Sequence, residues 1–300
     1  MPEIQPPLHP LPLEELPALP DLRLAVIGHV EVVEFLQVPQ LPTAGAIVRA
    51  RSSRLEPAGG GAVVAVQLAR LLGQPVPFFT ALGRDRAGEE AAAALEALGL
   101  EVHVAWRQTP TRRAITYVDD PGERTITVIG ERLAATAADP LPWPLLTGCD
   151  GVFVTACDAA ALQQARQARV LAVTPRLGLP VLQTAGVTVD LLVGSALDPS
   201  EQVPAGALQH PVGLRIATRG AEGGELEPGG RFLAPQRHRP VVDTYGAGDS
   251  FAAGVTAGLA AGWSLHQALS LGCHCGASCL NGAGPYSGQL RRGSGAWLQP

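Results

Sequence analysis

The stretch from Val241 to Phe251 constrains this chain more than any other part of its sequence. Two valines lead into Asp243-Thr244, a Gly-Ala-Gly turn follows, and apolar residues at helical spacing continue to Ala261. This pattern predicts a loop that runs into the N-terminus of a helix. Because the turn residues are small, their backbone N–H groups can point at one spot, and the helix dipole adds positive charge there. Such a junction suits a phosphate or an oxyanion.

Asp249 falls in the first turn of this predicted helix. The simplest interpretation of an acidic residue there is a helix cap, because its side chain accepts hydrogen bonds from free N–H groups at the positive end of the dipole. Short motifs stay hypotheses until their context agrees. The rest of the chain therefore decides whether Asp249 is more than a cap.

Composition excludes several classes of function. Three hundred residues with 46 % hydrophobic content can bury the core of one large domain. A formal net charge of −5 without any basic run argues against a nucleic-acid surface. All 22 basic residues are Arg, which excludes chemistry that requires Lys, such as a Walker A phosphate loop or a Schiff base. Apolar stretches are interrupted before they reach membrane-spanning length, so no membrane partner is expected.

The first twenty residues and the number of cysteines give two further expectations. Residues 1–20 are rich in proline and have no basic region, which indicates an irregular leader and not a signal peptide. Residues 21–300 are expected to form the domain. The five cysteines, an odd number in a chain of this length, indicate reduced thiols and a cytoplasmic location.

Strand-like and helical patterns alternate along most of the domain. The run from Leu22 to Gly28 has the composition of a buried strand. Further strands are expected at 76–82, 151–155, 170–174, 191–193 and 214–217, and helices at 62–72, at 89–98, after Asp249 and from 265 to about 280. This alternation predicts an α/β fold with a mostly parallel sheet and helices on both faces.

Two segments interrupt the alternation. Residues 31–55 and 101–129 carry β-like runs and turn residues without a helical period. In the second segment Val102, Val104 and Trp106 alternate as in a half-buried strand. We therefore expect both segments to form a small β-sheet that covers one face of the domain as a lid. Its edges and face also offer a surface for a homodimer.

Five motifs then carry a resemblance to a known family. They are, in chain order, Gly59-Gly60-Gly61 before a helix, Gly83-x-Asp85-x-x-Gly88, Gly122-Glu123-Arg124-Thr125, Thr218-x-Gly220-x-x-Gly223 and the string from Asp243 to Phe251. Together they resemble the ribokinase-like (PfkB) carbohydrate kinases over about residues 22–286. The resemblance implies a Rossmann-like domain with a β lid that transfers the γ-phosphoryl group of ATP to a hydroxyl of a small sugar or sugar-like metabolite.

The resemblance also assigns roles within the Gly-rich turn. It makes Asp249 the general base that accepts the proton of the attacked hydroxyl. It uses the N–H groups of Gly246, Ala247 and Gly248 to hold the negative charge on the transferred phosphoryl oxygens, which suits a reaction that depends on positioning and charge stabilisation.

On the nucleotide side the resemblance implies a second set of residues. The expected ATP-binding residues are Thr218, Gly220, Gly223, Ser195, Thr244 and His274. For His274 a plain position on a helix surface is the alternative. Mg²⁺ is expected to bridge the phosphates, with Asp198 as a carboxylate that binds it directly or through water. A monovalent cation is a further cofactor that the family leaves open.

On the acceptor side the chain departs from its relatives. The resemblance places Gly59, Gly60, Gly61, Arg124 and Asp249 beside the acceptor. Where the family commonly has an Asn and an Asp after the first strand, the chain has Glu31 and Val33, and the usual Asn of the glycine motif falls at Val64. Where the family often has Asn-x-x-Glu, the chain has Ser195-x-x-Asp198. These changes remove partners for sugar hydroxyls, so the acceptor is not expected to bind as ribose does.

Charged residues near these positions leave alternatives open. Glu31 or Glu34 can supply the missing carboxylate, or either can be a solvated charge at a strand end. Arg112, Arg113 and Arg124 of the expected lid match the geometry of a phosphate or carboxylate, which permits an acidic or phosphorylated acceptor, although solvated arginines are common on strands.

The cluster Cys273-His274-Cys275 with Cys279 permits a metal site. Because structural zinc sites use paired ligands from separate segments, and residues two apart on a helix face different sides, buried thiols are favoured instead.

The sequence therefore predicts a kinase and leaves two rivals. One is a catalytically silent protein of the same fold that binds a nucleotide or a sugar. The other is a nucleoside kinase, which differs in the shape of the acceptor pocket.

Overall fold

A large mostly parallel sheet forms the centre of the molecule. The computed structural model describes residues 6–204, 206–237, 239–293 and 297–298, so residues 1–5 of the expected leader lie outside it. Within these residues nine strands form one sheet in the order β13 (Gly230–Phe232), β12 (Gly224–Glu227), β11 (Val212–Thr218), β10 (Val189–Ser195), β9 (Val170–Val173), β8 (Gly151–Val154), β1 (Leu24–Ile27), β4 (Val76–Gly83) and β5 (Leu100–Arg107). From β11 to β5 every pair is parallel, and β12 and β13 form an antiparallel edge.

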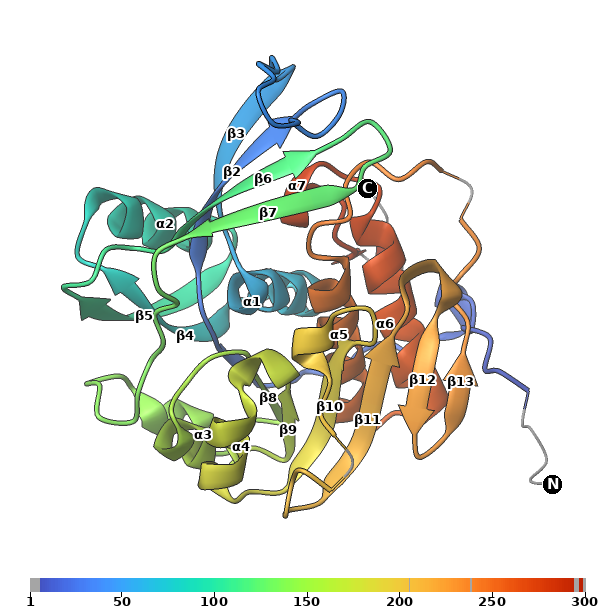
Figure 1. Cartoon of the computed structure of the whole chain (residues 1–300). Coiled ribbons are helices and arrows are strands. Elements are labelled where there is room, and N and C mark those ends of the chain that lie inside the picture. The colour runs from blue at the N-terminus through green and yellow to red at the C-terminus, as the bar shows by residue number, and fades with distance from the viewer. Residues whose placement is uncertain (1–5, 205, 238, 294–296, 299–300) are drawn as a thin grey trace.

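Helices cover both faces of this sheet (Figure 1). One layer holds α1 (Gly60–Leu72), α2 (Arg86–Ala97), α5 (Ala247–Ala260) and α6 (Leu265–Cys279), and the other holds α3 (Ala159–Ala165) and α4 (Leu179–Ala185). Strand β1 shows why the sequence requires two layers. Its Leu24 and Val26 belong to the first core and its Ala25 and Ile27 to the second, as side chains that alternate across a strand must. The expected fold class is confirmed.

A separate four-stranded sheet lies across the top of the domain in Figure 1 and forms the lid. Its order is β3 (Ser52–Ala58), β2 (Glu31–Gln37), β6 (Arg113–Val118) and β7 (Arg124–Ile129). Strands β2 and β6 are parallel, and the other two pairs are antiparallel. Both strands of the first expected lid segment are in this sheet.

The second expected lid segment, about residues 101–129, is wrong in its first part. Residues 100–107 form β5, which pairs with β4 from Val76 opposite Leu100 to Gly83 opposite Arg107 and therefore belongs to the main sheet. Because β5 is an edge strand with α2 on one face, most of its side chains are exposed or half-buried, as are most of those in lid strands β3 and β7. The lid part of this segment begins at Arg113.

The lid is continuous with the main sheet at two points. Only residues 28–30 separate β1 from β2, and Gly59 alone separates β3 from α1. The first connection places Glu31 where the lid meets the carboxyl end of β1. The second places the N-terminus of α1 at the same edge. Both ends of the β2–β3 hairpin therefore converge on one spot.

The described part of the leader packs on the domain. It is mostly irregular, with a short turn at Leu13–Glu15. Leu8 forms a bridge with Phe232 of β13, and the Leu11 N–H donates to Ser270 Oγ of α6 at 2.9 Å. Leu16 is buried in the first core. The leader therefore covers the antiparallel edge of the sheet and one side of α6.

Three smaller elements complete the described fold, namely α7 (Gly284–Ser287), β14 (Arg291–Arg292) and β15 (Trp297–Leu298). No helix among the described residues is both long and apolar enough to cross a bilayer.

Asp85 fastens the start of α2 to the segment that leads into the lid. Its carboxylate accepts hydrogen bonds from the Gly88 N–H at 2.8 Å, the Thr111 N–H at 2.7 Å and the Thr111 hydroxyl at 2.7 Å. Burial opposes the charged form, but the hydrogen bonds from Thr111 and Gly88 prevail and hold the pKa of Asp85 below its ordinary value of 3.8.

Replacing Asp85 by alanine is expected to lower the free energy of unfolding by about 2 kcal/mol at neutral pH, because a helix cap is lost and the Thr111 N–H loses its acceptor. A group with a lowered folded-state pKa stabilises above its unfolded pKa, and that contribution is lost as the pH falls through the folded value. The cost of the substitution should therefore shrink below about pH 3.8. Denaturant unfolding at several pH values measures it. Glu89→Ala, at an exposed position of α2, is the control.

Candidate active site

A cavity of about 790 Å³ lies between the lid and the carboxyl ends of the central strands. Its walls come from the loops after β1, β9, β10 and β11, from the N-termini of α1 and α5, and from the inner face of β7. In open α/β sheets this edge is where ligands bind. The five motifs that were separate in the sequence contribute unequally to it.

The Gly-rich turn, residues 243–249, forms one wall. Gly246 is the N-cap of α5 with φ of +83°, a left-handed conformation that a residue with a Cβ adopts only with strain. The N–H groups of Ala247, Gly248 and Asp249 have no hydrogen-bond acceptor among the described residues, as is usual for the first turn of a helix. Gly246, Ala247 and Gly248 all line the cavity. The turn thus presents free donors and the positive end of a buried fourteen-residue helix.

Asp249 projects from this turn into the cavity. It makes no capping hydrogen bond to α5. Its Oδ1 lies 3.9 Å from Arg176 Nη1, and a Cβ placed on Gly60 would lie 3.0 Å from the same oxygen. A side chain larger than hydrogen at position 60 would therefore crowd the carboxylate. The N-termini of α1 and α5 meet at this point, with the Asp249 carboxylate between them.

The buried Asp243 carboxylate holds the Gly-rich turn in place through hydrogen bonds. This carboxylate is only 1 % exposed and accepts hydrogen bonds from the Tyr245 N–H at 2.9 Å and the Gly284 N–H at 2.8 Å. Arg54 of lid strand β3 donates to it at 3.3 Å, and the guanidinium lies over the Phe35 ring. A buried carboxylate needs such partners. Arg54 therefore ties the lid to the Gly-rich turn.

A second contact joins the lid and the turn at β7. Arg124 donates to the Thr244 carbonyl at 2.9 Å, and the Thr244 N–H donates to the Gly122 carbonyl at 3.1 Å. Arg124, Thr244 and Glu123 line the cavity. The Thr244 hydroxyl oxygen is buried and has no hydrogen-bond partner in the described part of the chain. The Gly-Glu-Arg-Thr motif therefore contacts the turn directly.

The acceptor side of the cavity is built around Glu31 and His29. Glu31 forms an ion pair with Arg112, with Nε 3.1 Å from Oε1, and His29 Nε2 lies 3.7 Å from the same oxygen. Burial raises the pKa of Glu31. Burial also lowers the pKa of His29 to about 3, and the charges of Arg132, Arg176 and Arg112 lower it further. His29 is therefore a neutral ring beside a carboxylate and three guanidinium groups.

Other residues expected on the acceptor side are placed differently. Gly59 and Gly60 line the cavity, whereas Gly61 does not, since its Cα packs against Gly28. Glu34 is exposed away from the cavity. Val33 and Val64 are fully buried in the core. The two valines therefore contribute no side chain to the cavity, whereas Glu31 does.

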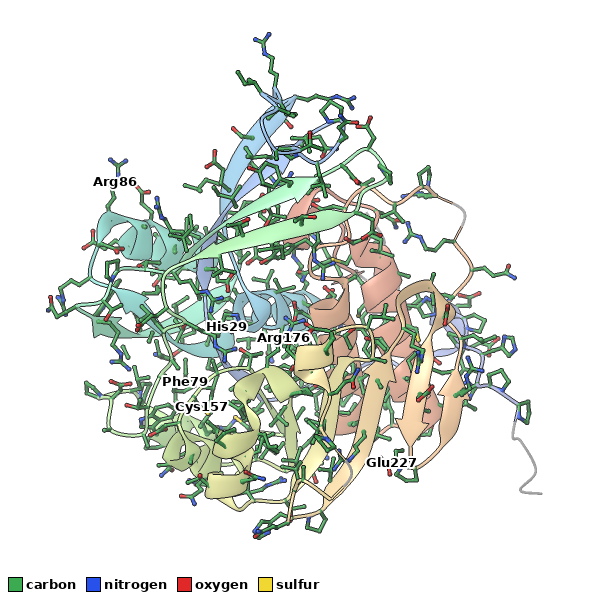
Figure 2. The ribbon with its side chains drawn as sticks, viewed as in Figure 1. His29, Phe79, Arg86, Cys157, Arg176 and Glu227 are labelled. Atoms are coloured by element: carbon green, nitrogen blue, oxygen red, sulfur yellow. The ribbon has the colours of Figure 1, made fainter. Side chains whose placement is uncertain are left out.

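Two arginines on this side were not identified in the sequence. Arg132 follows β7 and Arg176 follows β9, and both line the cavity together with Arg112 and Arg124. Arg113 does not line it. Figure 2 shows His29 and Arg176 near the middle of the molecule, below the lid strands. Arg176 also forms an ion pair with the buried Glu201 at 2.5 Å, and Glu201 accepts from the Ser195 N–H at 2.8 Å.

The nucleotide side contains most of the residues expected there. Thr218, Gly220, Gly223, Ser195 and Asp198 line the cavity at the ends of β10 and β11. The Asp198 carboxylate accepts from the Ser200 hydroxyl and N–H, and these hydrogen bonds lower its pKa. No group of three or more His, Cys, Asp or Glu side chains that could hold a metal ion occurs among the described residues.

His274 lies outside the cavity. Its Nε2 is 2.7 Å from the Leu11 carbonyl of the leader, and burial lowers its pKa. The residues of α6 that line the cavity are Cys273, Gly276 and Ala277, which share one helix face because they are spaced by three and four. Helical periodicity could have identified this face, but it could not show that the leader packs on the side of α6 that carries His274.

The cysteines form no disulfide or metal site within the described residues. All five are free and buried, and burial raises the pKa of Cys273 and Cys279 to about 12. Such thiols stay protonated, so the interpretation of Cys273, Cys275 and Cys279 as small buried residues holds.

The sequence and the fold were compared with known proteins. Residues 21–290 match the family model described as pfkB family carbohydrate kinase. The chain is 24 % identical over 293 residues to a ribokinase of Arabidopsis thaliana, covering 86 % of this chain and 76 % of the relative. It is 30 % identical over 275 residues to an ATP-dependent ribose-1-phosphate kinase of Halopiger xanaduensis, covering 85 % and 91 %. The solved structure of Arabidopsis thaliana ribokinase complexed with ribose and ATP superposes with a TM-score of 0.68 at 20 % identity, covering 90 % and 96 %. That structural likeness supports the fold.

His29 is expected to remain neutral from pH 8 to about pH 4, because its pKa in the folded protein is about 3. Below about pH 6.5 the unfolded chain binds a proton at this residue that the folded chain does not, so its contribution to stability falls as the pH is lowered towards 3. Ring NMR signals, assigned with a His29→Gln variant, measure the titration. A midpoint above about pH 5 would contradict the buried, arginine-surrounded environment.

Proposed function

Because this chain belongs to the pfkB family of carbohydrate kinases, and so is a phosphotransferase that acts on a sugar hydroxyl, we propose that it transfers the γ-phosphoryl group of ATP with Asp249 as general base. The observation that carries the proposal is the convergence of two helix N-termini on one cavity with the Asp249 carboxylate between them. Free N–H donors lie on one side of that carboxylate and Glu31 and His29 on the other. A nucleotide and an acceptor can thus meet at Asp249.

The chemistry then follows from this placement. Asp249 takes the proton of the acceptor hydroxyl as its oxygen attacks the γ-phosphorus, and the bond from that phosphorus to the bridging oxygen of ADP breaks. The N–H groups at the start of α5 face the oxygens of the transferred group. They stabilise its charge without reorganising, since the helix already holds them in place. Arg176, 3.9 Å from Asp249, adds a positive charge beside the same group.

ATP is assigned to the side of the cavity formed by β10, β11 and α6. Thr218, Gly220 and Gly223 form the turn for its ribose and phosphates, and the small face of α6 at Gly276 and Ala277 leaves room for the base. The unpartnered Thr244 hydroxyl is free to donate to a phosphate oxygen. A solved structure of similar fold is complexed with ribose and ATP, which supports ATP as the nucleotide.

Mg²⁺ fits this site as an ion held mainly by the nucleotide. The described residues include no group of three metal-ligating side chains, and Asp198 is the carboxylate on the nucleotide side of the cavity. Mg²⁺ retains waters and takes few protein ligands beside phosphates, so Asp198 alone is compatible with it. When bound, the ion neutralises charge on the phosphates.

A monovalent cation would need an anionic site near the Gly-rich turn. Asp243 is such a buried carboxylate, and Arg54 already lies against it. We infer that Arg54 supplies the positive charge there, so that catalysis does not require a dissolved cation.

Kinase rates with and without potassium chloride are expected to agree within about twofold, with tetramethylammonium chloride matching the ionic strength. Arg54→Met should lower the rate about tenfold or more, because an unpaired buried carboxylate distorts the turn, and potassium should restore part of it. Arg51→Met is the matched control, since Arg51 lies on the exposed end of the lid and pairs with Asp120. Strong potassium dependence of the unmodified protein would contradict the inference.

We also propose that the outer face of the lid is the interface of a homodimer. Leu55 is 63 % exposed and Ile129 39 %, and both lie on the face of the lid that does not line the cavity. A second copy could bury these side chains. Light scattering on a size-exclusion column, with Leu55→Asp as the disruptive variant, tests this assignment.

Asp249→Asn is expected to lower kcat by ~10²–10⁴-fold, because the amide cannot accept the hydroxyl proton. The affinity for ATP should change by less than about twofold, since Asp249 does not contact the assigned nucleotide side. Coupled ADP assays and calorimetric titration with ATP measure the two effects. Asp21→Asn, at an exposed position outside the cavity, is the control. A variant that keeps most of its rate would show that Asp249 is not the base.

The two rivals are separated by a panel of acceptors. ADP formation with sugars and sugar phosphates, but not with nucleosides, is expected. Turnover confined to nucleosides would favour a nucleoside kinase. The absence of turnover with every acceptor, together with tight ATP binding, would favour a silent binding protein.

A further inference from the structure

Three arginines from separate segments line the acceptor side of the cavity. Arg112 enters from the start of β6, Arg132 from the segment after β7 and Arg176 from the segment after β9. All three line the cavity, and the positive charge of each lowers the pKa of the buried His29 ring. Guanidinium groups from three separate segments of the chain therefore face one cavity.

Within the described residues, three carboxylates lie near these three guanidinium groups, but they form ion pairs with only two of them. Arg176 is paired with Glu201 at 2.5 Å and lies 3.9 Å from Asp249. Arg112 is paired with Glu31. Arg132 has no hydrogen-bond or ion-pair partner among the described residues, although it faces the cavity. The Arg132 guanidinium can therefore bind an anionic group of a ligand in the cavity.

Arg132 and Arg112 are held together by the lid. Arg113 pairs with Ile129 in the β6–β7 ladder, so the residues just before β6 and just after β7 are neighbours. A Cβ on Gly130 would lie 3.9 Å from the Arg112 Cα. The two side chains thus project from adjacent lid positions into the acceptor side, where Glu31 already engages one of them.

A neutral sugar would not satisfy these groups. Its hydroxyls would leave the Arg132 guanidinium without an anionic partner. A phosphate ester has three acceptor oxygens and nearly two negative charges, which suits the fork of a guanidinium group. Arg132, unpaired within the described part of the chain and beside Arg112 in the cavity, thus points to a ligand that carries a phosphate group.

We propose that the acceptor is a sugar that already carries a phosphate group, and that Arg132 and Arg112 bind this phosphate while a hydroxyl of the same molecule faces Asp249. The product is then a sugar bisphosphate. This inference rests on the proposed function, because it names the acceptor of that reaction. Arg132 is a binding residue for the group that does not react.

The test measures binding separately from turnover. The Asp249→Asn variant is loaded with saturating ADP and Mg²⁺, so that phosphate groups cannot occupy the nucleotide side. It is then titrated calorimetrically with matched pairs: ribose against ribose 1-phosphate and ribose 5-phosphate, and fructose against fructose 1-phosphate and fructose 6-phosphate. Gluconate tests a sugar with a carboxylate. At least one phosphate ester is expected to bind about tenfold or more tightly than its parent sugar and than gluconate.

Two further variants identify the residues. Adding Arg132→Met should remove about tenfold or more of the affinity for the ester and leave binding of the parent sugar unchanged. Adding Arg113→Met should change neither, because Arg113 is the first residue of β6, next to Arg112, and does not line the cavity. Equal loss in both variants, tighter binding of the free sugars or of gluconate, or no binding of any ester would overturn the inference.

The outcomes separate this inference from the proposed function. If the unmodified protein phosphorylates free sugars and binds no ester, the kinase assignment stands and the inference fails. If an ester binds through Arg132 but the unmodified protein forms no ADP with it, the phosphate site stands and the catalytic assignment fails.

Discussion

The fixed position of the α5 N-terminus is the constraint on which the rest of the site depends. The helix packs on β8, β9, β10 and α6, and the buried Asp243 holds the preceding turn through the Tyr245 and Gly284 N–H groups. Free donors at the end of so rigid a helix can meet developing charge without moving. The other parts of the site are arranged around this point. Helix α1 can approach it only because residue 60 is glycine, and β9 delivers Arg176 to the opposite side.

The sequence predicted the main sheet and its helices because those elements are defined by local patterns. Buried runs such as Leu24–Ile27 and the glycine at Gly73 that ends α1 are visible without knowledge of partners. The sequence assigns residues 101–107 to the lid because Val102, Val104 and Trp106 alternate with other residues, a pattern that fits an edge strand of the main sheet as well as a lid strand. Which sheet a strand joins depends on long-range pairing, which the residues of one strand do not encode.

The site was predictable where its residues lie in one contiguous motif. The turn from Gly246 to Asp249 and the Thr218–Gly223 segment line the cavity as expected. Arg132, Arg176 and Glu201 escaped notice because each is a single charged residue in a loop, and only the fold brings them together. His274 was placed by its distance along the chain, whereas the leader occupies the helix face on which it lies. The sequence alone therefore does not show which single charged residues of loops reach the cavity, or which face of a helix points towards it.

The chain passes directly from β1 into β2 and from β3 into α1, so the cavity lies between two parts of the molecule, the lid and the main sheet with its helices. Glu31, Arg112 and Arg132 belong to the lid strands or their ends, whereas Asp249 and the α5 N-terminus belong to the main sheet and its helices. Under the proposed function, substitutions in the lid can therefore change which acceptor binds while Asp249 and the α5 N-terminus keep their geometry. Related chains can thus differ in the small molecule that they bind through changes in the lid strands alone, and keep the same arrangement of groups at the start of α5.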